Sequence, residues 1–184
     1  MMSCMRVFLA VLACFLVTAV PASAGQVNPQ LLVLRQADVP AGFALDREQS
    51  GQRTNEIESK RDRRLPALLE RWGRVTGYET EYDHRDGTLT SRADLFRNAE
   101  GSRLMMAYVV DEAKTSGIKG LRRTPVRIGS GGWLYGGGSG AGAFNLVIWR
   151  HQRVFAGLAA FGVQKDRMLG LARAQQRRIA AAVR

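Results

Sequence analysis

Two apolar runs separated by four polar residues constrain the fold of this chain more than any other feature. The runs cover residues 144–149 and 154–161, and Arg150, His151, Gln152 and Arg153 lie between them. Two such runs joined by a short polar loop predict a β-hairpin. Both faces of each run are largely apolar, so we expect both strands to be central in a sheet and covered on both sides.

The N-terminus has the pattern of a secretory signal peptide. A short segment containing Arg6 precedes a continuous apolar stretch at residues 7–20, and the sequence Ala22-Ser23-Ala24 is typical of a cleavage site. The apolar stretch is shorter than the ~18 residues that suggest a spanning helix. A lipoprotein alternative would use Cys14, but the apolar stretch continues beyond that cysteine. We therefore expect a Sec-type signal at residues 1–24, cleaved after Ala24, and an exported domain at residues 25–184.

Cysteine content and charge narrow the functional classes. Both cysteines, Cys4 and Cys14, lie in the predicted signal, so the exported domain is expected to hold neither a disulfide nor a cysteine-ligated metal. The net charge of +11 favours contact with anionic polymers or lipid head groups. Nucleic acid is not expected as a partner, because an exported protein does not meet it. No cofactor or metal site is predicted.

The remaining segments predict a mixture of strands and helices. Residues 74–83 and 88–97 alternate between two faces on either side of Asp86-Gly87, which indicates a second hairpin. Residues 133–135 suggest a further short strand. Asn98 can cap a helix over residues 99–116, and residues 166–184 predict a basic amphipathic helix. The expected fold is α+β, with a mostly antiparallel sheet of about five strands and helices packed on it.

Three stretches resemble small exported bacterial α+β domains of uncharacterised function. Residues 34–43 (LRQADVPAGF) are similar to the "ADLPxGF" opening of such domains, residues 73–78 to their first strand, and residues 128–129 and 147–153 to their second half. The resemblance extends to PsbP-like and Mog1-like proteins and LpqN-type extracytoplasmic domains. It departs at Ser130-Gly131, which follows Ile128-Gly129. The resemblance implies layers of helix and antiparallel sheet, and it transfers no catalytic residue.

Polar candidates for chemistry are few. His84 lies beside Asp83 and Asp86, which is compatible with a hydrolase centred on His84 with neighbouring acids, although no G-x-S-x-G motif accompanies it. His84 and His151 are both expected in turns, and neither belongs to a metal-spaced cluster. Glu79 and Glu81 share one face of a predicted strand and could act as an acid–base pair. We favour a solvated strand face, paired with Arg74 or Arg92 across the hairpin.

The glycine-rich residues 129–142 lack the lysine of a phosphate-binding loop and lead into a strand. They predict an edge loop or a lip over a pocket. Aromatic side chains at strand spacing could line a cleft between sheet and helices for an apolar ligand, although such residues are more often core. The candidate ligand-binding residues are Tyr78, Tyr82, Trp133, Tyr135 and Trp149.

The sequence thus favours a non-enzymatic exported module that binds an envelope partner or an apolar or amphipathic ligand. The first alternative is the His84 hydrolase. The second is an electrostatic tether, in which Arg173, Arg177 and Arg184 of the last helix hold an anionic polymer or lipid.

Overall fold

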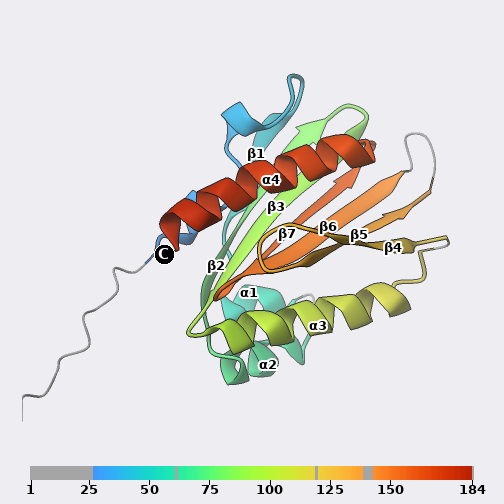
Figure 1. The fold of residues 1–184 in the computed structure, drawn as a ribbon. Coiled ribbons are helices and arrows are strands. Elements are labelled where there is room, and N and C mark those ends of the chain that lie inside the picture. Colours follow the sequence, from blue (N-terminus) through green and yellow to red (C-terminus); the bar gives the residue numbers. More distant parts are fainter. Residues whose placement is uncertain (1–26, 61, 119, 139–142, 184) are drawn as a thin grey trace, which may run out of the picture.

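Seven β-strands form one antiparallel sheet with helices on both faces (Figure 1). The structure is a computed structural model, and it describes residues 27–60, 62–118, 120–138 and 143–183. The strands are β1 (Ala44–Gln52), β2 (Arg74–His84), β3 (Gly87–Phe96), β4 (Arg122–Val126), β5 (Gly132–Gly137), β6 (Phe144–His151) and β7 (Val154–Phe161). The helices are η1 (Pro29–Leu32), η2 (Gln36–Asp38), α1 (Asn55–Ser59), α2 (Leu65–Arg71), α3 (Ala99–Thr115) and α4 (Lys165–Ala182).

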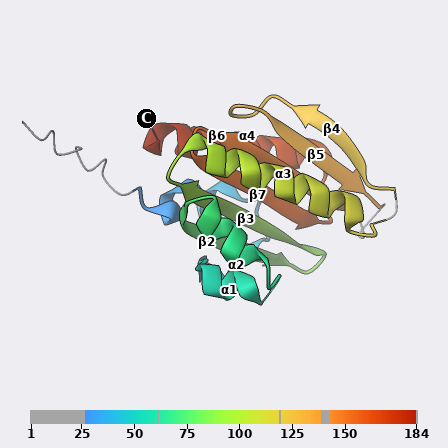
Figure 2. The same cartoon turned by 90° about the horizontal axis from the view of Figure 1, so that it is seen from below.

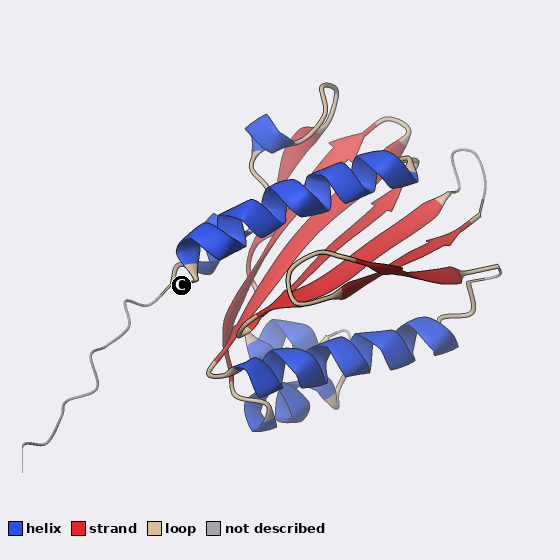
Figure 3. Ribbon diagram, viewed as in Figure 1, coloured by secondary structure: helices blue, strands red, loops and turns tan. Residues whose placement is uncertain are grey.

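The predicted central hairpin is confirmed. The strand order is β1-β2-β3-β7-β6-β5-β4, so β6 and β7 each have a neighbour on both sides. The loop is shorter than expected, because His151 pairs with Val154 and only Gln152 and Arg153 turn the chain. Gln152 has φ of 49°, in the left-handed region that a two-residue hairpin of this kind needs. Figure 3 shows the long central strands side by side in one twisted sheet.

The prediction of about five strands was too low, because both edge strands lack a clear apolar pattern. β1 is mostly polar, and its register against β2 shifts between Asp46 and Gly51. β4 contains Pro125, whose missing N–H restricts it to an edge. Both strands are held by pairing with an inner neighbour, β2 and β5 respectively, and not by burial of their own side chains.

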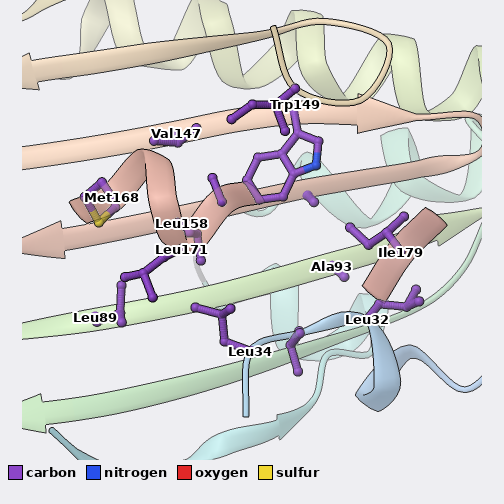
Figure 4. Close-up of a cluster of buried hydrophobic side chains, with 14 of the residues drawn as sticks. Leu32, Leu34, Leu89, Ala93, Val147, Trp149, Leu158, Met168, Leu171 and Ile179 are labelled. Carbon is purple, nitrogen blue, oxygen red and sulfur yellow. The ribbon is translucent and has the colours of Figure 1, made fainter. Parts of the chain in front are cut away.

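Helix α4 covers one face of the sheet and encloses the larger core. Asn98-capped α3 and the basic C-terminal helix were both predicted to within two residues of their observed ends. Figure 4 shows the side chains of α4 meeting those of the sheet and of the N-terminal segment, with Trp149 at the centre. Met168, Leu171 and Ile179 supply the helical side, and each large apolar side chain so buried contributes about 1.5–3 kcal/mol.

Helices α1, α2 and α3 lie on the opposite face, as Figure 2 shows. Their core is smaller and includes Leu69, Phe96, Met105, Ile148 and Phe155. α3 packs against β3, β6 and β7, whereas α2 contacts β2. Among the described residues, no helix is long and apolar enough to cross a membrane.

Candidate functional site

A groove opens on the face of the sheet that carries α3. Antiparallel pairing places Arg92 of β3, Gly157 of β7 and Ile148 of β6 side by side on this face. The next row along the strands holds Glu81, Thr90, Ala159 and Leu146. These two rows form the floor, and Met105 and Val109 of α3 form a wall, around a cavity of about 260 Å³.

The cavity exists because the central strand has small side chains where α3 passes over it. Gly157 has ordinary space above it: a Cβ added there would lie 3.6 Å from the Ile148 Cγ2 atom and 3.7 Å from the Val147 oxygen. Its backbone angle does not require glycine either. Glycine within a strand interior weakens the strand and often marks a place where a ligand approaches the backbone closely.

Sequence reasoning missed these floor residues. The signal was present in the second apolar run, where Gly157 and Ala159 are two successive small residues between Phe155 and Phe161 on one face of β7. Reading that interruption as a cavity requires knowing that α3 crosses this face, which no spacing in the sequence reveals.

One wall of the groove is charged and largely buried. Glu79 of β2 is 1% exposed and forms an ion pair with Arg53, while Arg92 lies 3.8 Å from it across the hairpin. The sequence predicted a pairing with Arg74 or Arg92; Arg92 lies beside Glu79, whereas Arg74 pairs with Asp94. The prediction that Glu79 lies on a solvated strand face is wrong, because its side chain is buried between Arg53 and Arg92.

Arg92 connects the groove to a deeper ion network. Its Nε atom donates to the Oδ2 atom of Asp94 at 2.7 Å, and its Nη1 atom donates to Glu58 of α1 at 3.1 Å. Asp94 is fully buried and also accepts from the Nε atom of Arg74 at 2.7 Å. Burial disfavours the charged form of Asp94, yet the guanidinium groups of Arg92 and Arg74 hold the pKa of this carboxyl below its ordinary value.

Three carboxylates gather beside the groove, on the neighbouring strands β1 and β2. Asp46 of β1 pairs across the strands with Glu81 of β2, and Asp83 follows two residues later on the same face. The three groups lie within 4.8 Å of one another. Burial raises the pKa of Glu81, and the neighbouring carboxylates of Asp83, Glu79 and Asp46 raise that pKa further. The groove therefore runs from an apolar floor on β6 and β7 to an acidic end on β2, with Arg92 of β3 between them.

The five predicted aromatic residues do not line one pocket. Tyr82 and Trp149 belong to the core beneath α4, where the Tyr82 hydroxyl donates to the Leu34 carbonyl at 2.7 Å and the Trp149 Nε1 atom donates to Gln176 at 2.8 Å. Tyr78 is on the same face, half-buried. Together with Tyr82 it lines a shallow cavity of about 410 Å³ under the N-terminal segment.

Trp133 and Tyr135 lie on the other face, at the edge of the smaller core. Arg123 of β4 stacks over the Trp133 ring at 4.3 Å from its centroid. Tyr135 lines a separate cavity of about 500 Å³ at the end of α3. Alternation along the strands separated the five aromatics, because β2, β5 and β6 each present successive side chains to opposite faces.

The histidines occupy strand ends and not turns as predicted. His84 ends β2, where its Nδ1 atom accepts from the Asp86 backbone N–H at 3.2 Å and its ring stacks on Phe43. The described residues around the adjacent cavity include no serine, threonine or cysteine. The described lining of that cavity thus offers His84 the carboxylate of Asp86 but no hydroxyl or thiol nucleophile. His151 ends β6.

The predicted anionic-surface residues divide as follows. Arg173 and Arg177 are exposed on α4, and no ion pair to a described residue involves either of them. Arg184 lies outside the described residues, as do residues 139–142 of the glycine-rich run. Arg178, next to Arg177, instead binds Asp38 of the opening motif through two hydrogen bonds of 2.9 Å.

Comparison with known proteins leaves the family open. No protein-family model and no curated protein match the chain, so the resemblance to PsbP-like, Mog1-like and LpqN-type domains is not shown. Among solved structures, the chain is similar to the extracellular domain of PknH from Mycobacterium tuberculosis, with a TM-score of 0.47 and 11% identity. That match covers 80% of this chain and 91% of the PknH domain.

Proposed function

We propose that this protein is an exported binding module that holds a small amphipathic ligand in the groove between α3 and the sheet. The observation that carries the proposal is the cavity over Gly157 and Ala159, with apolar residues at one end and the carboxylates of Glu79 and Glu81 at the other. Ligand sites are typically concave and mostly apolar with a few polar groups, and this cavity of about 260 Å³ is slightly smaller than their usual size of about 300–1,000 Å³, which suits a small ligand.

Filling the groove tests this function. Gly157→Val places a strand-favouring side chain in the cavity, where the adjacent atoms leave ordinary van der Waals space for its Cβ. We expect this variant to keep its thermal unfolding midpoint and to lose binding of octyl-chain probes measured by titration calorimetry. Gly170→Val is the matched control, because Gly170 is exposed on α4 with open space around it. Equal binding by both variants would contradict the proposal.

Export is part of the same proposal and has its own test. Expressed with its full N-terminus in a bacterium with a Sec pathway, the protein should be recovered outside the cytoplasm. N-terminal sequencing should then begin at Gly25. Recovery of an uncleaved chain in the cytoplasm would remove the basis for an envelope role.

A second candidate function, the electrostatic tether, is favoured by the exposed Arg173 and Arg177 on the outer face of α4. Binding to vesicles containing anionic lipid should weaken as salt is added, because a charge-driven contact is screened over about 8–10 Å at 0.1–0.15 M salt. The double variant Arg173→Gln/Arg177→Gln should bind such vesicles less tightly than the parent. Binding that ignores both salt and these substitutions would exclude the tether.

A further inference from the structure

The acidic end of the groove is local and opposes the overall charge of the protein. The chain carries 27 basic and 16 acidic residues, yet Asp46, Glu81 and Asp83 bring three carboxylates within 4.8 Å of one another. Asp46 accepts the backbone N–H groups of Glu48 and Gln49. Within the described part of the chain, none of the three carboxylates forms an ion pair. Arg53 offsets their mutual repulsion at Glu81 only in part, because the Arg53 guanidinium is itself paired with Glu79.

Glu81 belongs both to this carboxylate group and to the lining of the cavity. Glu81 is half-buried. Across the neighbouring strands β3, β7 and β6 it is followed by Thr90, Ala159 and Leu146 of the floor. A molecule lying on the apolar floor with one end at Glu81 would therefore meet Asp46 and Asp83 with that end. The floor thus offers a contact surface to an apolar group and the carboxylates offer one to a polar group.

We propose that the groove selects an amphiphile whose polar end is a cation of the alkylammonium type. The inference rests on the proposed function and adds the charge of the ligand to it. The alkyl part would cover Gly157 and Ala159 against Met105 and Val109 of α3. The ammonium group would lie among Glu81, Asp46 and Asp83, where charge-assisted hydrogen bonds to carboxylates are about twice as strong as neutral ones.

A divalent metal ion fits this place less well than an organic cation. Calcium takes six to eight oxygen ligands, and the carboxylates here lie beside an apolar floor. An ammonium group, by contrast, needs only a few acceptors on one side and carries its own apolar chain into the cavity. The acidic end adjoins the apolar floor, and this arrangement favours an organic cation with an alkyl chain over a metal ion.

Three probes of equal chain length test the proposal: octylammonium, octanol and octanoate, each below its micelle concentration and at neutral pH. Calorimetry on the full exported domain should show octylammonium binding at least about tenfold more tightly than octanoate, with octanol between them, since tenfold is only about 1.4 kcal/mol. Glu81→Gln should remove most of that preference. Glu48→Gln, an exposed charge change on the same strand as Asp46, should keep it.

The outcomes separate the two proposals. Equal binding of all three probes, lost in Gly157→Val, would overturn the cationic head group and leave the groove as the ligand site. Tighter binding of octanoate, or a preference that Glu81→Gln does not change, would overturn it as well. Octylammonium binding that survives Gly157→Val would place the probe elsewhere. If none of the probes binds, or if calcium binds at Glu81 in their place, the inference fails.

Discussion

The burial of charged side chains is the feature that the sequence pattern predicted least well. In β3, Arg92 and Asp94 lie on the face opposite Leu89, Ser91, Ala93 and Leu95, as strand alternation requires. Alternation alone does not show that this second face is also covered. The burial of Asp94 is tolerated because Arg74 and Arg92 both bind it, whereas an unpaired buried carboxylate would be strongly destabilising.

Asp94→Asn should therefore lower the free energy of unfolding by about 3–5 kcal/mol, because it leaves two buried guanidinium groups without their shared anion. Urea unfolding at neutral pH measures this change. The exposed Asp111→Asn, which loses only a surface pair with Lys114, should cost at most about 1 kcal/mol. Similar losses for the two variants would contradict a stabilising role for the network.

Asp94 also makes the free energy of unfolding depend on pH. The folded pKa of Asp94 is lowered, so the unfolded chain binds its proton first as the pH falls. The stability that Asp94 contributes is present above its ordinary pKa of 3.8 and is lost as the pH falls through the folded value. Asp94→Asn should lack this portion of the acid-induced loss.

Glu81 should behave in the opposite sense. Burial raises the pKa of Glu81 above 4.5, and the carboxylates of Asp83, Glu79 and Asp46 raise it further. Arg53, which directly follows β1, lowers this pKa in part. The charged carboxylate thus costs stability at neutral pH, and this cost disappears as the pH falls through the folded pKa to 4.5. Glu81→Gln should unfold at higher urea concentration than the parent at pH 7.

The difference between Glu81→Gln and the parent should vanish at about pH 4, where both states are protonated. Glu48→Gln, on the exposed side of β1, should show no such pH-dependent gain. A loss of stability in Glu81→Gln at pH 7 would mean that Glu81 has a stabilising partner in the fold. If Glu81→Gln is more stable than the parent and loses the preference for octylammonium, then Glu81 is a binding residue whose charge lowers the stability of the fold.

At the scale of elements, polar contacts fix how α4 sits on the sheet. Gln175 of α4 is fully buried, and its Oε1 atom accepts from the Ser91 hydroxyl at 3.0 Å while its Nε2 atom donates to the Arg92 carbonyl at 3.0 Å. The Ser91 hydroxyl oxygen also accepts the Leu34 N–H. One hydroxyl thus links helix α4, strand β3 and the N-terminal segment.

Gln175→Met keeps the size and apolar contact of this side chain and removes its hydrogen bonds. We expect it to lower the free energy of unfolding by about 1–3 kcal/mol, because the Arg92 carbonyl and Ser91 hydroxyl are left buried without this partner. Thermal unfolding by circular dichroism measures the change. Gln49→Met, exposed on β1, provides the control and should be nearly neutral; a neutral Gln175→Met would show that the contact does not anchor α4.

At the scale of the whole molecule, the two faces of the sheet are packed differently. α4 and the N-terminal segment fill one face with large apolar side chains (Figure 4). On the other face, α3 stands over small residues and the space towards β2 is occupied by ion pairs and the groove. A ligand site on the α3 face therefore leaves the main core undisturbed, and groove substitutions can be tested in a folded protein.

The sequence by itself determined the central hairpin, the second hairpin, the two long helices and the α+β class, because these depend on local periodicity and caps. Only the tertiary structure decided which strands are edges, which of the five aromatic residues are core, and where a cavity lies. A strand's alternation states that its side chains divide into two sets, but the helix that crosses each face decides what they meet. That is why Glu79 became a buried ion-pair partner and Gly157 became the floor of a groove.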